Sequence, residues 1–225
     1  MQLKANLHFH TADDPEDFKI INYTFYEGID EAAKLGFEVI ALTCHNKLVG
    51  SADYKKYAEN KGILLIAGIE KNIEKRHVLI LNADSAAETV DTFEKLAEYK
   101  KRRPDIFVLA AHPYFPTSYS LREKLERNIR LFDAIEYSWF YSKRINYNRR
   151  SELTAKKYNL PLVAASDTHD LNLMNTNYAL IDAEEKNEAA IFKAIRENKF
   201  QNITSPRKFW REMIFRTTLK MNLKF

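Results

Sequence analysis

The 225-residue sequence contains a single cysteine, Cys44, which excludes a disulfide within the chain and is typical of a reducing cytoplasm. No apolar run approaches the roughly 18 residues that a membrane-spanning helix requires. The first residues run directly into a predicted strand, without the basic and then apolar pattern of a secretory leader. Internal repeats and low-complexity segments are also missing. These absences predict a cytoplasmic globular protein with no membrane partner.

The excess of one charge sign is small. Lysine and arginine together number 35 against 31 acidic residues, which gives a formal net charge of +4. This charge favours anionic substrates, but taken alone it is too small to indicate a nucleic-acid-binding protein. A composition of 45% hydrophobic and 29% charged residues indicates an ample core, and the length suits one α/β domain.

Short apolar strands alternate with helical stretches along the chain, which is the pattern of repeated βα units. The predicted strands are 3–8, 38–42, 64–67, 77–81, 107–111, 134–137 and 162–165, with a possible later pair at 178–181 and 202–204. The predicted helices are 25–35, 51–61, 89–102, 120–130, 144–158 and 187–198. We expect a closed or nearly closed barrel in a single domain.

The seventh predicted strand ends in Asp167 and His169, whose side chains leave a strand on the same face because they are two residues apart. A carboxylate beside an imidazole is half of a metal coordination shell. Matching residues occur at other strand ends. They are His8 and His10 after the first strand, His45 after the second, Glu70 after the third, His77 at the head of the fourth, and His112 after the fifth.

Strand alternation predicts where these side chains point. In the first strand, one face should carry Asn6, His8 and His10 and the other Leu3, Leu7 and Phe9. In the second, Ala41, Thr43 and His45 should lie opposite Ile40 and Leu42. In the fifth, Val108, Ala110 and His112 should lie opposite Leu109 and Ala111. A single histidine at a strand end is usually a hydrogen-bonded core residue. All six histidines of the chain occupy such positions. We therefore predict a metal cluster at the carboxyl mouth of the barrel.

The ordered motifs resemble those of the PHP (polymerase and histidinol phosphatase) superfamily across about residues 3–204. They are His8-Phe9-His10-Thr11, Leu42-Thr43-Cys44-His45-Asn46, Gly68-Ile69-Glu70, His77, Ala111-His112-Pro113 and Ser166-Asp167-Thr168-His169. The resemblance implies a distorted seven-stranded (β/α)7 TIM-like barrel that holds two or three divalent metals and cleaves phosphate esters.

The resemblance also implies which residues bind each metal. One metal would be bound by His8, His10, Glu70 and Asp167, a second by Glu70, His77 and His112, and a third by His45, His169 and an N-terminal acidic residue. We predict Asp14 for that acidic ligand, with Asp13 in reserve and a helix-capping or solvated acidic loop as the alternative. Cys44 stands where the family usually has aspartate, and we interpret it as a buried apolar residue rather than a ligand or nucleophile.

Such a cluster suits hydrolysis by a metal-activated hydroxide, with no nucleophilic side chain, and zinc, manganese and iron all fit the imidazole and carboxylate donors. For substrate binding we predict Arg144 and Arg149, because guanidinium groups bind phosphate in pairs of hydrogen bonds. The aromatic stretch 136–141 either stacks a base or packs against a helix. Residues 205–225 form a basic extension, which we predict to pack on the barrel, with a partner or a phosphate backbone as the alternative.

These features predict a hydrolase of the phosphoesterase class, with a small phosphomonoester or nucleotide as the favoured substrate. A nuclease on short nucleic acid and a catalytically silent metal-binding module are alternatives. A metallohydrolase acting on C–N bonds is a further rival, but it would commonly need a bridging lysine, and Lys71 has the wrong parity in its strand.

Overall fold

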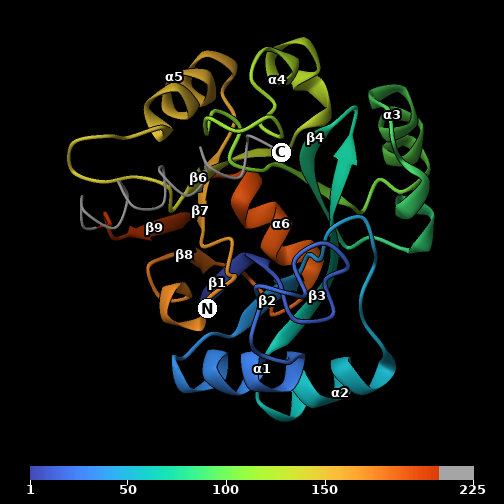
Figure 1. The fold of residues 1–225 in the computed structure, drawn as a ribbon, viewed down its shortest axis with the longest axis vertical. Helices are drawn as coiled ribbons and strands as arrows, with labels where there is room; N and C mark the ends of the chain where they lie inside the picture. Colours follow the sequence, from blue (N-terminus) through green and yellow to red (C-terminus); the bar gives the residue numbers. More distant parts are fainter. Residues whose placement is uncertain (208–225) are drawn as a thin grey trace.

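The computed structural model describes residues 1–207, which form an α/β barrel that is nearly closed (Figure 1). One nine-stranded sheet runs in the order β7-β6-β5-β4-β3-β2-β1-β8-β9. Its strands are β1 (Gln2–Phe9), β2 (Val39–Leu42), β3 (Leu64–Ile73), β4 (Arg76–Leu81), β5 (Phe107–Ala110), β6 (Ala134–Ser138), β7 (Leu162–Ala165), β8 (Asn177–Asp182) and β9 (Phe200–Thr204). The predicted fold class is confirmed, but the described chain has nine strands instead of seven, because the later pair forms complete strands.

The helices lie around the sheet, except for the last one. They are α1 (Phe25–Lys34), α2 (Ala52–Asn60), α3 (Phe93–Arg102), α4 (Glu123–Arg127), α5 (Asn148–Tyr158) and α6 (Glu188–Arg196), with short 3-10 turns at Ser85–Thr89, Ile129–Leu131 and Leu171–Leu173. All six helices are shorter than predicted, and α3, α4 and α5 are shorter by at least four residues. The side chain of Thr92 caps α3, so this helix begins later than the helical pattern indicated. The side chain of Asn148, the first residue of α5, bonds the backbone of Ser138, and α5 also begins later than indicated.

Residues 208–225, most of the predicted basic extension, lie outside the described residues. Its first part touches the barrel: the Arg207 amide donates to the carbonyl of Tyr141, and the Arg207 guanidinium lies 4.3 Å from the ring centre of Trp139. None of the helices within residues 1–207 is both long and apolar enough to cross a bilayer.

The sheet is mixed, so it departs from the all-parallel arrangement of a barrel built only of βα units. β3 and β4 form an antiparallel hairpin, and β8 is antiparallel to both β1 and β9. Within the hairpin Asn72 pairs with His77. Because β4 runs backwards, its first residues lie at the same end of the barrel as the last residues of β2 and β5. This geometry explains why a histidine at the head of a strand joins histidines at strand ends.

The hairpin turn consists of Glu74 and Lys75, and both have left-handed backbone angles, with φ of 48° and 65°. Two-residue hairpins of this kind favour Asn-Gly, since glycine avoids the clash of a side chain. A non-glycine residue in this conformation costs roughly 1–2 kcal/mol. The amide of Glu74, which donates to the carbonyl of Asp91, helps to hold the turn.

Two sets of contacts bring the edges of the sheet together. The Asn202 side chain on β9 accepts a hydrogen bond from the Ala164 amide at 2.8 Å and donates to the Leu162 carbonyl at 2.7 Å. Beyond β7, the Thr168 amide donates to the carbonyl of His8, and the His10 amide donates to the carbonyl of Thr168. The barrel is therefore closed at the mouth from which Asp167 and His169 project.

The barrel interior is filled by one apolar cluster that includes α6, which Figure 1 shows lying within the ring of strands. Leu3 and Leu7 of β1 belong to this interior cluster, whereas Phe9 packs outside against α1. The predicted strict alternation in β1 is therefore wrong, and the pairing register of β1 with β2 shifts between Asn6 and Phe9. Such an irregularity re-aims the side chains that follow it, here the histidines.

The same correction applies to β5. Leu109 and Ala111 face the interior and Val108 and Ala110 face α3, so regular alternation would have turned His112 outward. His112 instead has a left-handed backbone, with φ of 25°, and its side chain reaches Glu70. In β2 the prediction holds, because Ala41 faces the interior while Ile40 and Leu42 pack outside.

Candidate metal centre

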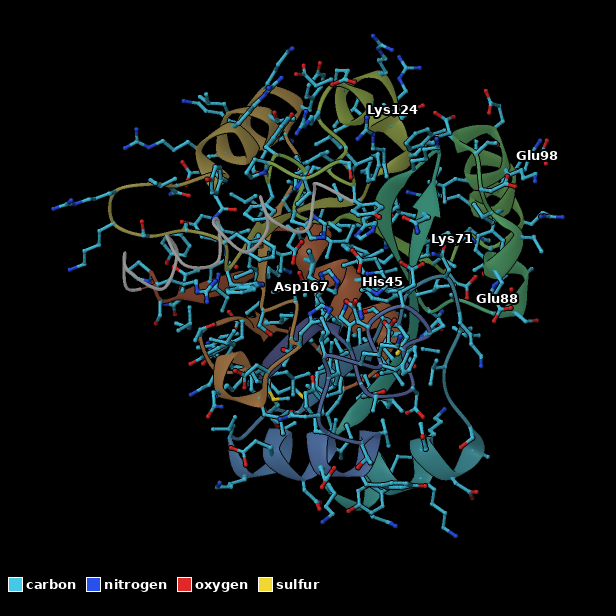
Figure 2. The ribbon with its side chains drawn as sticks, in the orientation of Figure 1. His45, Lys71, Glu88, Glu98, Lys124 and Asp167 are labelled. Carbon is cyan, nitrogen blue, oxygen red and sulfur yellow. The ribbon has the colours of Figure 1, made fainter. Side chains whose placement is uncertain are left out.

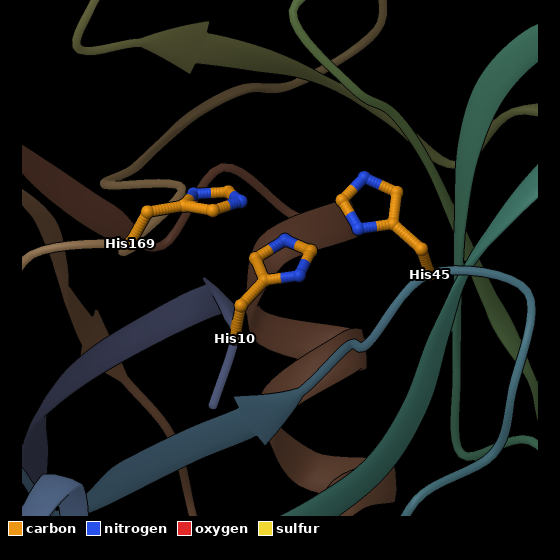
Figure 3. Close-up of side chains that lie close together, drawn as sticks. All are labelled: His10, His45 and His169. Atoms are coloured by element: carbon orange, nitrogen blue, oxygen red, sulfur yellow. The ribbon is translucent and has the colours of Figure 1, made fainter. Parts of the chain in front are cut away.

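All six histidines gather at one mouth of the barrel with Glu70 and Asp167. The predicted residues His8, His10, Asp14, His45, Glu70, His77, His112 and Asp167 are buried, and His169 is partly exposed. Figure 2 shows His45 and Asp167 at the centre of the molecule, and Figure 3 shows the imidazoles of His10, His45 and His169 converging from the ends of β1, β2 and the segment after β7. The His10 ring centre lies 4.6 Å from that of His45 and 4.3 Å from that of His169.

Glu70 is the residue on which the cluster converges. One carboxylate oxygen, Oε2, lies 3.2 Å from His8 Nε2 and 3.0 Å from His45 Nε2. The other, Oε1, lies 2.8 Å from His77 Nδ1 and 3.1 Å from His112 Nε2. A carboxylate whose two oxygens face different sets of imidazoles has the arrangement needed to bridge two metal ions.

Three groups of side chains offer ligand atoms within 4.8 Å of one another, so the site could hold several metal ions. They are His8, His10, Glu70 and Asp167; His45, Glu70 and His77; and His10, His45 and His169. The first group matches the set expected for the first metal. The second contains His45 where the resemblance implied His112. The third contains His10 where the resemblance implied an N-terminal acidic residue, for which we predicted Asp14.

The donor atoms of the cluster fit a bound metal. Buried nitrogens of His8, His10, His77 and His112 have no hydrogen-bond partner, nor does Oδ1 of Asp167. Buried polar atoms are almost always paired in folded proteins. Although His8 Nε2 and Asp167 Oδ1 are 3.3 Å apart, they do not form a hydrogen bond. Imidazole nitrogens and carboxylate oxygens left in this state are the donors that divalent transition metals bind.

Asp14, which was predicted from the sequence as a metal ligand, bonds two histidines of the cluster through a single carboxylate oxygen. Its Oδ2 lies 2.8 Å from His10 Nδ1 and 2.9 Å from His45 Nδ1, and it also accepts the His45 amide. Its Oδ1 accepts the amides of Glu16 and Asp17. The reserve residue Asp13 is exposed and bonds Tyr54, away from the cluster.

Asp17 was missed by the sequence reasoning. Its Oδ2 lies 2.8 Å from His169 Nε2 and 3.9 Å from His45 Nδ1, and it lines the cavity of the cluster. The loop around Asp17 carries several carboxylates and no strand or helix periodicity, so nothing in the sequence distinguished this aspartate from its neighbours.

Glu136, near the end of β6, was also missed. It is fully buried, its Oε1 lies 3.2 Å from His8 Nδ1, and its Oε2 accepts the amide of His112. Carboxylates that bond the second nitrogen of a ligating histidine fix its orientation and raise its basicity. The signal was present, because Glu136 occupies a strand end like the other members of the cluster.

Mutual attraction sets the charges of the metal-free cluster. Burial alone would lower the pKa of His8, but Asp167, Glu70 and Glu136 outweigh it and raise that pKa to about 10. Burial likewise opposes the attraction of Glu70 and Asp14 for His45, whose pKa rises to about 11. The pKa of Glu70 is held well below its usual value by the surrounding histidines, despite its burial. At His77 burial prevails and lowers the pKa.

A cavity of about 160 Å³ opens beside the cluster and is lined in part by Phe115, Tyr119 and Phe140. Neither Arg144 nor Arg149 lines this cavity: both are exposed, and Arg149 borders a separate groove with Arg122 and Arg150. Phe140, which belongs to the aromatic stretch 136–141, stacks on Phe115 at the cavity wall with 4.0 Å between the ring centres.

Two residues have the environments that the sequence indicated. Cys44 is buried in the apolar cluster outside the barrel, where burial raises the pKa of its thiol. Lys71 lies on the face of β3 opposite Glu70, toward α3 (Figure 2). It is therefore not placed to bridge metals in the manner of a C–N hydrolase.

Comparison with known proteins places these features in context. An uncharacterized protein of Methanocaldococcus jannaschii is 28% identical over 134 residues, which is 55% of this chain and 75% of that protein. A two-domain Bacteroides vulgatus protein containing a predicted PHP-like metal-dependent phosphoesterase superposes with a TM-score of 0.68 at 19% identity, over 91% of this chain and 65% of that one.

Two more solved structures share the fold. Protein PsfC of Pseudomonas syringae has a TM-score of 0.66 at 16% identity, over 97% of this chain and 99% of that one. A lesion-specific endonuclease of Pyrococcus furiosus has a TM-score of 0.65 at 14% identity, over 92% of this chain and 60% of that one. The chain thus spans less than two thirds of the Bacteroides and Pyrococcus chains.

The model of the PHP domain family matches residues 22–204. This stretch contains His45, Glu70, His77 and His112, and also Asp167 and His169, whereas His8, His10 and Asp14 precede it. Since the match extends over more than half of the chain, and the cluster at the barrel mouth offers several groups of metal-binding donors, this protein belongs to the PHP domain family.

Proposed function

We propose that this protein is a metal-dependent phosphoesterase that hydrolyses small phosphomonoesters or nucleotides. The observation that carries the proposal is the Glu70 carboxylate, whose two oxygens face separate imidazoles beside an open cavity. Oε2 lies near the unpaired Nε2 of His8, and Oε1 lies near the unpaired Nδ1 of His77. Bound divalent ions would lower the pKa of water toward neutrality and neutralise the charge of a phosphate in an in-line displacement.

Different residues of the cluster would hold each ion. His8, His10, Glu70 and Asp167 would hold one ion, and Glu70 with His77, His112 and the nearby His45 a second. His169 with Asp17 or Asp14 would complete a third site. Zinc, manganese and iron all fit these donors. Glu136 and Asp14 would keep His8, His10 and His45 oriented, because each holds an imidazole through a buried hydrogen bond.

The size of the cavity supports a small reacting group. A volume of about 160 Å³ is below the roughly 300–1,000 Å³ of typical ligand pockets, so the cavity suits a phosphate more than a whole nucleotide. The aromatic wall formed by Phe115 and Phe140 would exclude water from one side of that phosphate. Arg144 and Arg149 would reach only parts of a substrate that extend beyond the cavity.

The test combines metal analysis with an assay. Protein purified without chelator is expected to contain two or three metal ions per chain. With added manganese or zinc it should hydrolyse p-nitrophenyl phosphate, a monoester, faster than bis(p-nitrophenyl) phosphate, a diester. Glu70→Gln should lose at least one ion and about 100-fold or more of the activity, since a shared ligand supports several kcal/mol of transition-state stabilisation.

The matched control is Asp13→Asn. This substitution removes an exposed carboxylate that lies near the cluster in sequence but bonds Tyr54 instead of facing the histidines. This variant should keep both metal content and activity. Metal-loaded protein that cleaves neither ester would support a silent metal-binding module instead. Protein that stays empty and inactive on reconstitution would refute the proposal, and preference for the diester would favour a nuclease.

A further inference from the structure

A second, larger depression adjoins the metal cavity at the end of the β3–β4 hairpin. Its volume is about 910 Å³, and its lining is Asn72, Glu74, Lys75, Arg76, Asp91, Thr92, Ser118, Tyr119 and Lys124. Tyr119 lines both this groove and the cavity of the cluster, and its ring stacks 4.7 Å from that of His77. A molecule held in the cavity can therefore extend past Tyr119 into the groove.

The groove presents more positive than negative charge. Glu74 is paired with Lys124 on α4, which Figure 2 shows beside the hairpin, and Asp91 is paired with Lys95 outside the groove. The exposed ammonium of Lys75 and the guanidinium of Arg76 have no ion pair within residues 1–207. Arg76 donates to the backbone carbonyl of Ser118, and it attracts the exposed carboxylate of Glu123 without forming an ion pair with it.

The hairpin turn supplies an independent observation. Glu74 and Lys75 both have the left-handed backbone that glycine or asparagine adopts with less strain. Strained backbone of this kind concentrates at functional sites, where the side chain matters more than the conformational cost. Here the strain places the ammonium of Lys75 at the groove wall.

We propose that this groove binds a second anionic group of the substrate whose scissile phosphate lies in the metal cavity. The inference rests on the proposed function and narrows its substrate class. The cavity is sized for one phosphate, whereas Lys75, Arg76 and the 46% exposed ring of Tyr119 form a surface for further phosphate and for a planar base. The substrate is therefore a polyanionic phosphate ester, either a free nucleotide with several phosphates or a short nucleic-acid strand.

Lys75→Gly is the informative variant, because it removes the ammonium and relieves the strain at the same time. We expect it to fold with an unchanged or higher melting temperature. Its KM should rise about 3- to 10-fold for ATP or for 5′-phosphorylated hexathymidylate, the size typical of losing one charged contact, with kcat unchanged. The KM for p-nitrophenyl phosphate, which has no second anionic group, should not change.

Glu74→Gly is the matched control. It relieves the same strain but removes a negative charge and frees Lys124 from its partner. Its KM for the polyanionic probes should fall or stay constant. An effect with ATP alone assigns the groove to free nucleotides, and an effect with hexathymidylate assigns it to a strand. Equal KM changes for all three substrates, or none for both polyanionic probes, would overturn the inference.

A binding measurement separates failure of this inference from failure of the proposed function. Fluorescein-labelled hexathymidylate and a fluorescent ATP analogue are titrated with metal-loaded protein and followed by anisotropy. If no ester is hydrolysed but Lys75→Gly weakens binding of the probes and Glu74→Gly does not, the groove is an anion-binding site and only the phosphoesterase proposal is refuted. If Lys75→Gly leaves binding of both probes unchanged, the groove assignment is refuted whatever the enzyme hydrolyses.

Discussion

Glu136 connects two histidines of the cluster without facing the cavity. It lies beside the Nδ1 atom of His8 and accepts the amide of His112, and it is fully buried. An amide in its place would present an NH₂ group toward one of these two donors. We therefore expect Glu136 to be a positioning residue, which affects metal binding through the orientation of two imidazoles.

Glu136→Gln should bind metal about 10- to 100-fold more weakly, which is the usual cost of losing a carboxylate behind a ligating histidine. Competition against a chromophoric chelator measures the affinity, and the number of ions bound at saturation should not change. Glu152→Gln, at an exposed position of α5, is the control and should match wild type. Wild-type affinity in Glu136→Gln would show that His8 and His112 are held by other contacts.

The raised histidine pKa values predict that metal and protons compete. In the metal-free protein His8 and His45 have pKa values of about 10 and 11, so both are protonated at neutral pH. A metal ion binds the neutral imidazole, so binding must release protons, and the apparent affinity must rise with pH up to about 11, the higher of the two pKa values. Calorimetric titrations at pH 7.5 in two buffers of different ionisation enthalpy should reveal at least two protons released per chain. Heats that do not depend on the buffer would contradict these charge states.

At the scale of elements, Asn202 on β9 forms side-chain hydrogen bonds to β7, the strand at the opposite edge of the sheet. Its side chain binds one carbonyl and one amide of β7, so the two ends of the sheet are joined by an amide side chain. Asn202→Ala leaves one amide and one carbonyl of β7 without that partner, and because both hydrogen bonds are only partly buried we expect a total cost of about 1–3 kcal/mol. Denaturant unfolding should show a loss in this range. Gln201→Ala, at the exposed neighbouring position, should change the free energy of unfolding by less than about 0.5 kcal/mol.

Element positions could be predicted well because they depend on local pattern. β7 begins and ends where the short apolar run between Pro161 and Ser166 does, and α3 ends before the Arg103-Pro104 pair, as the restriction on the residue before proline requires. The directions of the strands could not be predicted in the same way. Nothing in the apolar run 77–81 shows that β4 pairs antiparallel with both neighbours, because that outcome depends on sheet contacts.

The candidate site was predictable to the extent that its members stand at strand ends. Alternation alone would have aimed His112 away from the cluster, and the left-handed backbone at that residue reverses the outcome. Asp17 was not distinguishable because its loop has no periodicity, and only the fold brings it to His169. The roles of Arg144 and Arg149 in substrate binding stay predictions, since both residues lie outside the cavity lining.

For the whole molecule, bound metal should contribute substantially to stability. The cluster draws residues from β1, β3 and β4 and from the segments after β2, β5 and β7. A ligand that binds only the folded state at a concentration 100 times its Kd adds about 2.7 kcal/mol. Chelation should therefore lower the melting temperature, and manganese or zinc should restore it. In Glu70→Gln this difference should shrink. An identical melting temperature with and without chelator would mean that metal does not bind the folded protein selectively.

The place of β1 in the sheet has a consequence for the timing of assembly in the cell. β1 lies between β2 and β8, and its last residues contact Thr168, so two of its contacts involve residues made more than 150 residues after β1 itself. Contacts so distant along the chain are slow to form because loop closure must precede them. His8 and His10, which we propose as metal ligands, are likewise made long before Asp167 and His169. A nascent chain therefore cannot complete the proposed metal site until synthesis has passed residue 169.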